Sequence, residues 1–286
     1  TNKKVILFHA ASNGELEQLK PIFRSIDKNE YFIFLTTSSP SSIDQISMDE
    51  VDAYCYQAFD FPLTVNNFFS RVKPEKYIIT RHDIWPNHIM LSKKYCKNIF
   101  LINANLPKSS KRLFPVINSL YKYLFSKFDT IYTVSEIMKK ELLKLVNANK
   151  VEIVGDTRFD QINYRYLKNS KKFPSSFKKT KNILFGSIEK QDLDIIFNAL
   201  KENQFIDNNI KLIFVPHEPS EKLIFEIEEK LKELDIKNSR FSAIEHADRN
   251  VDALIVDTVG VLADIYKYSS ISYIGCGFGK GVHNVI

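Results

Sequence analysis

The sequence predicts an α/β protein with two Rossmann-like domains, each built on a doubly wound parallel sheet. Three observations support this fold class. Short β-rich runs alternate with helical patterns, the runs are apolar over their whole length, and a polar, basic segment divides them into two series. Strands of a parallel sheet are covered on both faces, so they lack the alternation of half-exposed strands. The βαβα order favours doubly wound sheets.

The first series predicts a domain over residues 1–164. Its apolar runs indicate strands at 5–8, 31–37, 76–80, 98–103, 130–134 and 151–154. A helix is expected after the first strand, because its apolar residues recur at helical spacing. These residues are Leu16, Leu19, Ile22, Phe23 and Ile26.

The second series predicts a domain over residues 182–286. Its strands are expected at 182–186, 211–215, 252–256 and 271–275. Another apolar stripe predicts a helix and consists of Leu223, Ile224, Ile227 and Leu231. Residues 165–181 are polar and basic and contain Pro174, so we interpret them as an interdomain linker, although a solvated surface loop has the same composition. Two such domains predict a ligand-binding cleft between the carboxyl ends of their sheets.

Composition narrows the class of function. The 286 residues are 44% hydrophobic and 26% charged, an ordinary globular mixture. No apolar run reaches the roughly 18 residues that a membrane-spanning helix needs. The three cysteines are far apart and show no metal-binding spacing. A formal charge of +6 fits an anionic substrate or a membrane surface. Because the lysines are scattered and no nucleic-acid module is visible, we expect no nucleic-acid partner.

The stretch Ser12-Asn13-Gly14-Glu15 follows the first strand and has two interpretations. Ser12 and Glu15 have the spacing of a capping box, in which Glu15 reaches back to the amide of Ser12. The stretch also lies at the carboxyl end of a strand, where sites collect. There Gly14 would let another molecule come close, and the Glu15 carboxylate could take a proton from a hydroxyl. The local spacing leaves both interpretations open.

Two other strand ends carry charged side chains. Residues 80–87 hold His82, Asp83 and the single tryptophan, Trp85. Either Trp85 fills the core while Asp83 caps a helix, or the charged pair belongs to a site. Pro86 suits the first turn of a helix. Residues 154–160 place Asp156 and Arg158 after a strand. Arginine offers a planar fork for phosphate or carboxylate, but a surface ion pair is equally compatible.

The second domain has four candidate binding segments, one of which is DTVG at residues 257–260. Gly186-Ser187 is expected between a strand and a helix, as an anion site or as a plain N-cap. His217 and Glu218 follow a strand and are too few for a metal site. Four glycines within residues 275–281 form, with Lys280, His283 and Asn284, a loop able to hold a phosphate. Its spacing differs from both the dinucleotide fingerprint and the Walker loop, and a flexible surface loop is the alternative.

Taken together, these stretches resemble the 3-deoxy-D-manno-octulosonic acid (Kdo) transferases. These glycosyltransferases attach Kdo to lipid A precursors and use CMP-Kdo as donor. FHAASNGE resembles the family's HAxSxGE segment, RHDIWPN resembles ETELWPN, and VGDTRFD resembles GNxKFD. Four further stretches match family segments in the same order, namely LTTSSP, FDFP, INANL and DTVGVLADIYKYSSISYIGCGFGKGVHN. The resemblance therefore extends over nearly the whole chain.

The resemblance implies a GT-B fold and an inverting transfer of Kdo from CMP-Kdo to a lipid A precursor, without a metal or other cofactor. It implies an acceptor-side N-terminal domain, a donor-side C-terminal domain, and a location on the cytoplasmic side of the bacterial inner membrane. Glu15 would be the general base, with Asp83 and Arg158 stabilising the transition state. The expected substrate- or donor-binding residues are Ser12, Gly14, Gly186, Ser187, Pro216, His217, Glu218, Val259, Gly260, Val261, Gly275, Gly277, Lys280, His283 and Asn284.

The chain departs from the family pattern at several positions. Arg81 replaces a Glu, Asp83 is one methylene shorter than the family's Glu, and Arg158 replaces a Lys. His217 replaces an Arg, and Val261 stands where many members have Glu. The family also has a hydrophobic N-terminal anchor and a Glu-Pro-Ala segment after the residue that matches Ile286. We therefore expect a divergent member truncated at both ends.

Two other functions fit the same sequence. The chain could be another GT-B nucleotide-sugar enzyme, such as a transferase with a different donor or an epimerase, because one fold serves many reactions. It could instead be a non-catalytic nucleotide-sugar binder whose catalytic geometry has drifted through Arg81 and Asp83.

Overall fold

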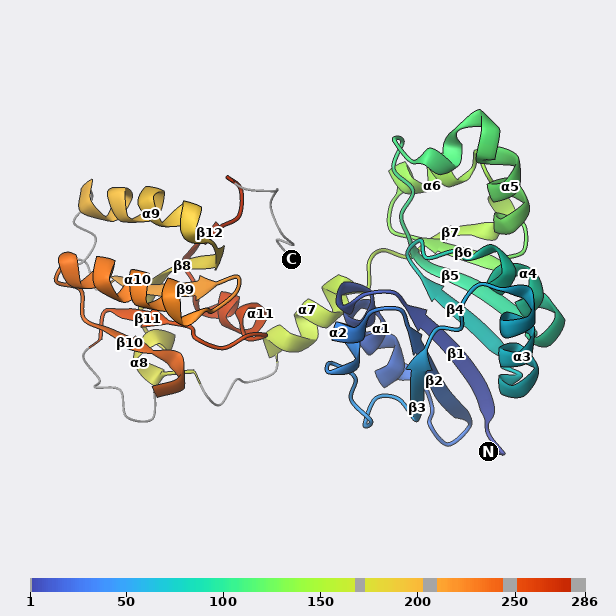
Figure 1. The fold of residues 1–286 in the computed structure, drawn as a ribbon, viewed down its shortest axis with the longest axis horizontal. Coiled ribbons are helices and arrows are strands. Elements are labelled where there is room, and N and C mark those ends of the chain that lie inside the picture. Colours follow the sequence, from blue (N-terminus) through green and yellow to red (C-terminus); the bar gives the residue numbers. More distant parts are fainter. Residues whose placement is uncertain (1, 168–172, 203–209, 244–250, 279–286) are drawn as a thin grey trace. The chain divides into compact units, whose positions relative to one another are not determined.

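The structure is a computed structural model that describes residues 2–167, 173–202, 210–243 and 251–278 (Figure 1). The chain divides into two compact units, a first unit of residues 1–161 and a second unit of residues 162–286. Each unit contains one sheet, and every strand pair in both sheets is parallel. The α/β fold class with two parallel-sheet domains is confirmed.

The first unit alternates strands and helices. In chain order its elements are β1 (Lys4–Ala10), α1 (Asn13–Ser25), β2 (Tyr31–Thr37), α2 (Pro40–Ile43), β3 (Ala53–Tyr56), α3 (Pro62–Val72), β4 (Lys76–Thr80), α4 (Pro86–Tyr95), β5 (Asn98–Ala104), η1 (Lys111–Leu113), α5 (Pro115–Phe125), β6 (Thr130–Thr133), α6 (Glu136–Leu142), η2 (Ala148–Lys150), β7 (Val151–Ile153) and α7 (Arg158–Leu167), the last of which runs on past Gln161. The strand order is β3-β2-β1-β4-β5-β6-β7.

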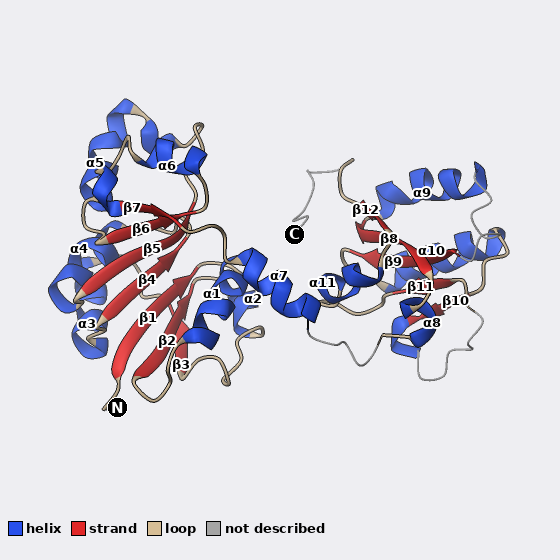
Figure 2. Cartoon of the chain, turned by 180° about the vertical axis from the view of Figure 1, so that it is seen from behind, coloured by secondary structure: helices blue, strands red, loops and turns tan. Residues whose placement is uncertain are grey.

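Helices cover both faces of this sheet (Figures 1 and 2). Alternate residues of β1 explain why: Leu7 joins the core under α3 to α6, whereas Ile6 and Phe8 join the core under α1. Phe8 is fully buried and meets the ring of Phe23 on α1 edge to face, with ring centroids 5.0 Å apart. Burying a side chain of this size stabilises the fold by about 1.5–3 kcal/mol.

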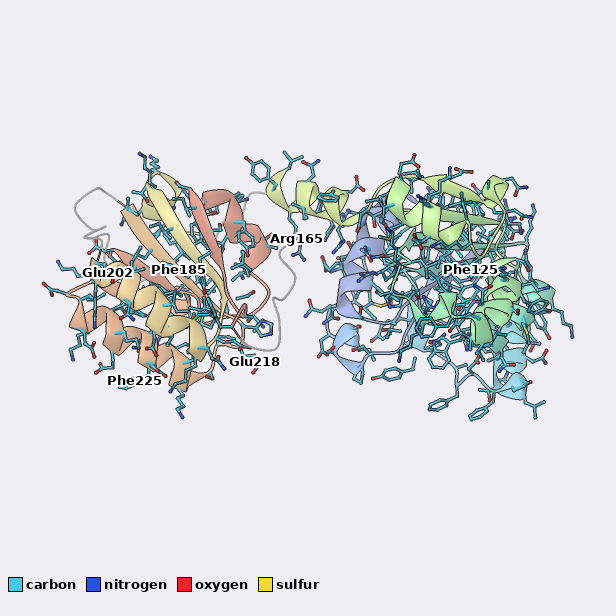
Figure 3. All side chains as sticks on the ribbon, turned by 90° about the horizontal axis from the view of Figure 1, so that it is seen from above. Phe125, Arg165, Phe185, Glu202, Glu218 and Phe225 are labelled. Atoms are coloured by element: carbon cyan, nitrogen blue, oxygen red, sulfur yellow. The ribbon has the colours of Figure 1, made fainter. Side chains whose placement is uncertain are left out.

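The second unit repeats this plan. Its elements are α8 (Ser175–Lys178), β8 (Lys181–Ile188), α9 (Lys190–Glu202), β9 (Ile210–Pro216), α10 (Glu221–Glu233), β10 (Asn238–Arg240), η4 (Phe241–Ala243), β11 (Ala253–Ile255), α11 (Leu262–Ile265), η5 (Tyr266–Tyr268) and β12 (Ile271–Ile274), and the strand order is β10-β11-β9-β8-β12. Phe185 packs with α9 and α10, whereas its neighbour Leu184 packs on the opposite face with α8 and α11. Figure 3 shows Phe185 in this unit and Phe125 in the first, and both are buried.

The segment expected to be a linker contains local structure at its described ends. Residues up to Leu167 complete α7, and Ser175–Lys178 form α8. Phe173 and Phe177 are buried in the core of the second unit, together with Leu184. Residues 168–172 lie outside the described part of the chain. The proposed boundaries of 1–164, 165–181 and 182–286 therefore stay a prediction.

Candidate active site

The order of the first sheet predicts where a site should lie. The chain moves from β1 outward through β2 and β3, then returns to place β4 on the other side of β1. Ligands of open α/β sheets bind outside the carboxyl ends of the strands at such a reversal. Glu15 follows β1 and Asp83 follows β4, so both predicted catalytic carboxylates occupy this edge.

The carboxylate of Glu15 folds back onto the chain, but its partner differs from that of the expected capping box. Its Oε2 atom accepts a hydrogen bond of 2.7 Å from the amide of Ala11, not from that of Ser12. The serine half of the box is present, because Ser12 is the N-cap of α1 and its Oγ accepts from the amide of Glu15 at 3.4 Å. Within the described residues, the hydrogen bond to the carboxylate uses Oε2 only, which leaves Oε1 for a second partner.

The surroundings of Glu15 favour its protonated form. Its exposed fraction is only 4%, and burial is the largest influence that raises the pKa of the carboxyl group above 4.5. The negative charge of Asp83 adds to this increase, whereas the Ala11 amide and the charges of His9 and Arg81 lower the pKa. A carboxylate with a raised pKa is a stronger base than an exposed glutamate.

Asp83 is held by two aromatic side chains. Its Oδ2 atom lies 2.7 Å from Nε2 of His9. Burial raises the pKa of Asp83, but hydrogen bonds from His9 and Trp85 and the charges of His9 and His82 outweigh burial, and the pKa is lowered. Asp83 is therefore an anion at neutral pH.

Trp85 does not fill the core, because 44% of its surface is exposed. It is the N-cap of α4, and Pro86 occupies the first turn as expected. Asp83 does not cap this helix. Asp60 does, since its carboxylate accepts from the amides of Asn87 and His88 at 3.3 and 3.1 Å. The interpretation of residues 80–87 as a core plug with an Asp83 cap is therefore wrong.

Arg158 is oriented by the neighbouring Asp156. Its Nε and Nη2 atoms donate to Oδ2 of Asp156 at 2.9 and 2.6 Å. Oδ1 of Asp156 accepts from Nε2 of Gln18 on α1 at 2.9 Å. The pKa of Asp156 is lowered because these hydrogen bonds outweigh burial, the largest single influence. This ion pair is therefore tied to α1, the helix that carries Glu15.

A second set of hydrogen bonds joins the turn at Asp156–Arg158 to β5. Nδ2 of Asn103 donates to Oγ1 of Thr157 at 2.9 Å, and the Thr157 amide donates to Oδ1 of Asn103 at 3.0 Å. The Thr157 hydroxyl in turn donates to the carbonyl of Gln18 at 2.6 Å. Sequence reasoning missed Gln18, Asn103 and Thr157. Two signals were available. Asn103 is a polar residue at the carboxyl end of a strand, and Gln18 is a polar residue on the buried side of a helix.

In the second unit, Gly186 and Ser187 do not lie at the start of a helix. Strand β8 continues through both to Ile188, which corrects the expected strand–Gly-Ser–helix order. A Cβ atom at Gly186 would lie 2.9 Å from the hydroxyl of Tyr266. A side chain at this position would therefore displace the end of Tyr266. The next residue, Ser187, adopts a left-handed backbone with a φ of 51°.

Asp192 joins the ends of β8 and β12. One oxygen accepts from the hydroxyl of Tyr273 at 2.8 Å. The other accepts from the amides of Glu189 at 2.8 Å and Cys276 at 3.0 Å. We call these three hydrogen bonds the Asp192 clamp, and Gly275 lies directly against it. The sequence analysis did not single out Asp192, although an aspartate in the first turn of a helix is a typical acceptor for backbone amides.

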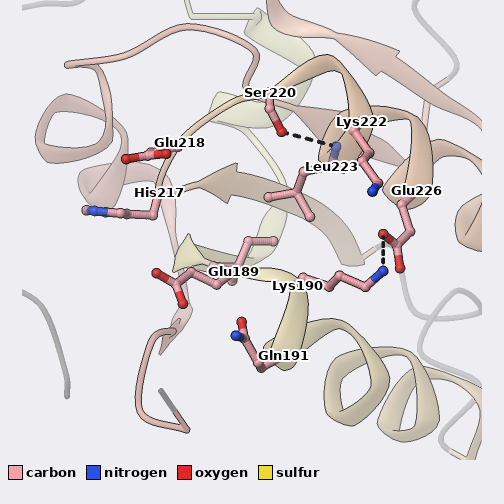
Figure 4. A pocket seen from close by; sticks show the side chains of 10 residues that line it. Glu189, Lys190, Gln191, His217, Glu218, Ser220, Lys222, Leu223 and Glu226 are labelled. Atoms are coloured by element: carbon pink, nitrogen blue, oxygen red, sulfur yellow. Dashed lines mark hydrogen bonds and ion pairs between the residues drawn. The ribbon is translucent and has the colours of Figure 1, made fainter. Parts of the chain in front are cut away.

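The carboxyl ends of β8 and β9 border a cavity of about 320 Å³ (Figure 4). Figure 4 shows His217 and Glu218 together on one side of this cavity and the ion pair of Lys190 with Glu226 on the other. Nζ of Lys190 lies 3.4 Å from Oε2 of Glu226. The remaining lining residues are Ile188, Glu189, Gln191, Ser220, Lys222 and Leu223. His217 and Glu218 are exposed, whereas Pro216 is buried at the end of β9.

The other predicted binding residues lie at several places. Val259 is 75% exposed, Gly260 has a φ of 84°, and Val261 is the N-cap of α11. Gly277 is exposed after β12, and Gly14 has no atom within 4 Å of an added Cβ. Lys280, His283 and Asn284 lie outside the described residues.

Two features of the described residues bear on other functions. Nowhere in those residues do three His, Cys, Asp or Glu side chains gather so that they could hold a metal ion. Of the helices in the same part of the chain, none has both the length and the apolar character needed to cross a bilayer.

The sequence of residues 1–161 matches the family described as 3-deoxy-D-manno-octulosonic-acid transferase (kdotransferase). The chain is also similar to proteins named 3-deoxy-D-manno-octulosonic acid transferase. It is 27% identical to that of Aquifex aeolicus, covering 99% of this chain and 73% of the relative. It is 25% identical to that of Haemophilus influenzae, covering 98% and 67%.

Solved structures share the fold. A UDP-GlcNAc 2-epimerase from Neisseria meningitidis bound to UDP-GlcNAc superposes with a TM-score of 0.62 at 14% identity, covering 94% of this chain and 76% of that one. Another UDP-N-acetylglucosamine 2-epimerase gives 0.61 at 13% identity, covering 95% and 74%. These two enzymes and this chain have the GT-B fold, and at such low identity the likeness concerns the fold alone.

Proposed function

This chain belongs to the 3-deoxy-D-manno-octulosonic acid (Kdo) transferase family and is a glycosyltransferase, and we propose that it moves Kdo from CMP-Kdo to a lipid A precursor with inversion. The observation that carries this proposal is the position of Glu15 and Asp83. Both lie at the strand-order reversal of the first sheet, within the residues that match the family. No metal or other cofactor takes part in the proposed reaction.

Glu15 is the proposed general base. Its Oε2 atom is anchored on the amide of Ala11, so the free lone pairs of Oε1 would receive the proton of the acceptor hydroxyl. Burial and the charge of Asp83 raise the pKa of Glu15, which strengthens it as a base. With 4% of the residue exposed, the hydroxyl would have to enter directly in front of Oε1.

The proposed step forms one C–O bond and breaks another. The acceptor oxygen attacks the anomeric carbon of Kdo while its proton passes to Glu15. The bond from that carbon to the phosphate oxygen of CMP breaks, and its electron pair leaves with CMP. Attack on the face opposite to CMP inverts the anomeric carbon.

Asp83 and Arg158 are proposed to stabilise the charges that develop in this step. The anionic Asp83 would face positive charge on the sugar ring, and Arg158 would face the departing phosphate. Within the described residues, Arg158 uses Nε and Nη2 to bind Asp156, which leaves Nη1 for the substrate. The position of the guanidinium is thus fixed before substrate arrives, which is the condition for effective electrostatic stabilisation.

The second unit is the proposed site of the donor. The cavity beside His217 and Glu218 lies at the carboxyl ends of β8 and β9, where nucleotides bind in doubly wound sheets. The formal charge of +6 favours the approach of two anionic substrates. We assign the remaining predicted donor residues, including those beyond Phe278, to the same function.

A lipid acceptor implies work at a membrane surface, and we propose the cytoplasmic side of the bacterial inner membrane. Apolar side chains at the start of α3 support such contact. Phe59, Phe61 and Leu63 are 78%, 66% and 80% exposed. Burial of such side chains in lipid is favourable, in proportion to the apolar area removed from water.

The proposal is tested by assaying the purified protein with each of two donors in separate reactions. CMP-Kdo, formed during the assay, and UDP-GlcNAc are each incubated with a lipid A precursor, and the products are separated by mass. We expect a mass increase of the acceptor with CMP-Kdo only. Transfer from another nucleotide sugar, or epimerisation of UDP-GlcNAc without transfer, would establish a different GT-B enzyme. Donor binding without turnover would establish a non-catalytic binder.

A further inference from the structure

His9 is a buried histidine at the end of β1 that the reaction above leaves without a role. Its side chain is inaccessible to solvent, and both ring nitrogens have polar partners. Nδ1 lies 3.0 Å from Oγ1 of Thr36 on β2, and Nε2 lies 2.7 Å from Oδ2 of Asp83 after β4. Parallel pairing sets this arrangement, because His9 is directly opposite Thr36 in the ladder between β1 and β2.

The protons on this ring can be counted from the neighbouring donors. The hydroxyl of Thr36 has one hydrogen, which it donates to the carbonyl of Phe8 at 3.0 Å. In this arrangement Oγ1 of Thr36 accepts from Nδ1 of His9, which then carries a proton. In a neutral imidazole, Nε2 would then be an acceptor.

An acceptor at Nε2 would face the Asp83 carboxylate, which is also an acceptor when ionised. Two lone pairs repel each other at 2.7 Å, so one proton must lie between these atoms. An aspartic acid is ordinarily a stronger acid than an imidazolium, by roughly two to three pKa units, so this proton belongs to nitrogen.

We propose that His9 is an imidazolium that fixes Oδ2 of Asp83 and cancels part of its negative charge. His9 is thus a positioning residue that acts through Asp83. This role rests on the proposed function for its effect on catalysis, but not for its protonation. Thr36 orients the ring through its contact with Nδ1.

The same charge acts on Glu15. The groups that influence the pKa of Glu15 are the Ala11 amide, Asp83, His9 and Arg81. Asp83 opposes ionisation of Glu15, whereas His9 favours it. Trp85 and His82 also face Asp83, and the buried His88 is close enough to both His9 and Asp83 for their charges to act on it. Removing the charge of His9 would therefore leave Glu15 harder to ionise.

The protonation of His9 is tested on the wild-type protein by NMR of ¹⁵N-labelled histidine at neutral pH. His88 is an internal control. Its Nε2 donates to the carbonyl of Ala58 at 2.9 Å, and burial lowers its pKa, so we expect one N–H group on that ring. We expect two N–H groups on His9 and loss of the Nε2 proton in D83N. One N–H group on wild-type His9 would overturn the proposal.

The consequence for catalysis is tested with two variants. H9Q places an uncharged N–H donor near the position of Nε2, whereas H9N is too short to reach Asp83. For H9N we expect kcat to fall about 10²-fold, the effect of misplacing a reacting group by roughly 1 Å, with little change in KM. We expect a smaller loss for H9Q. In both variants the acid limb of kcat/KM should move to higher pH, because Glu15 has lost a favourable charge.

A matched control is H88Q, for which we expect no movement of the acid limb. An acid limb that stays in place in both H9Q and H9N would overturn the electrostatic role, whatever the loss of kcat. The two proposals fail separately. Absence of transfer from CMP-Kdo, with two N–H groups on His9, refutes the function but not the imidazolium. Transfer from CMP-Kdo with only one N–H group on His9 refutes the imidazolium but not the function.

Discussion

Oε2 of Glu15 accepts a 2.7 Å hydrogen bond from the amide of Ala11, four residues earlier in the chain. This bond fixes the carboxylate at the turn between β1 and α1. A capping role and a catalytic role were expected to compete for the side chain. The structure divides the two roles between the two carboxylate oxygens, because the hydrogen bond from Ala11 uses Oε2 only. Glu15 is thus anchored like a cap while Oε1 has the lone pairs that a base needs.

The first prediction concerns the variant E15Q. Its amide oxygen can still accept from Ala11, but the side chain can no longer take a proton. We expect kcat to fall about 10²–10⁴-fold, the usual contribution of a general base. Kdo transfer from CMP-Kdo measures this effect. The control is E17Q on the same helix, where the side chain pairs with Lys20 instead, and we expect it to retain turnover. Equal kcat in E15Q and the wild type would refute the assignment of Glu15 as base.

The second prediction concerns stability and pH. The pKa of Glu15 is raised above 4.5 in the folded protein, chiefly by burial, so ionisation of Glu15 opposes folding. The contribution of Glu15 to the free energy of unfolding is full below the unfolded-state pKa and is lost as pH rises through the folded-state pKa. We expect the free energy of unfolding of wild type minus that of E15Q to fall as pH rises from 4.5. Denaturant titrations at several pH values measure it, and a difference that rises with pH contradicts the prediction.

Much of the fold could be predicted because central parallel strands are continuous apolar runs. All ten expected strands are present, and β1 and β8 extend furthest beyond their predicted bounds. The two missed strands, β3 and β10, are both at sheet edges. Asn238–Arg240 is polar and only half-buried, so no apolar run indicates it. Its strand character comes from pairing with β11, which is a contact between distant segments.

The candidate site could be predicted only in part. Glu15, Asp83 and Arg158 were predicted from charged residues at strand ends and from the family resemblance, and their catalytic roles stay a prediction. Their partners were not, because the contacts join residues far apart in sequence. His9 and Asp83 are separated by 74 positions, and Gln18 and Asp156 by 138. Only the strand order brings such residues together.

The end of β8 shows a different limit. A glycine and a serine followed by Ile188 and Glu189 have the local composition of a helix start. The strand nevertheless continues, because Ile188 pairs with Pro216 after a register shift in the ladder between β8 and β9. Local residue type does not report where a ladder ends, so the length of this strand required the structure.

The third prediction concerns Asp156, whose carboxylate accepts from both Gln18 and Arg158. In D156N, an amide replaces one accepting oxygen and leaves buried donors without an acceptor. We expect the first unit to lose about 1–3 kcal/mol of unfolding free energy. The pKa of Asp156 is lowered from 3.8, so this difference is present above pH 3.8 and is lost as pH falls through the folded-state pKa.

The matched control is D160N, a change at an exposed aspartate on α7, for which we expect a shift within about 0.5 kcal/mol. Chemical denaturation followed by tryptophan fluorescence measures both variants, because Trp85 lies in the first unit. If D156N were as stable as D160N at neutral pH, the hydrogen bonds of Asp156 to Gln18 and Arg158 would contribute nothing to the free energy of unfolding.

The last prediction concerns Gly275, which follows β12. An added Cβ atom would lie 2.5 Å from the backbone oxygen of Ser187 and 2.8 Å from Oδ2 of Asp192. Neither neighbour can yield freely, because Ser187 belongs to β8 and Asp192 is bound by Tyr273 and Cys276. We expect G275A to destabilise the second unit by about 1–3 kcal/mol, the effect of overpacking a closed site. Thermal unfolding of the purified variant measures it.

The control for G275A is G14A on α1, where no atom lies within 4 Å of the added Cβ. Alanine favours a helix over glycine by about 0.5–1 kcal/mol, so we expect unchanged or slightly increased stability. The contrast separates two reasons for a glycine, a close packing contact in one case and open space in the other. Unfolding transitions at the same temperature for G275A and the wild type would show that the ends of β8 and β12 move apart readily. The hydrogen bonds of Asp192 would then not hold Gly275 and Cys276 against β8.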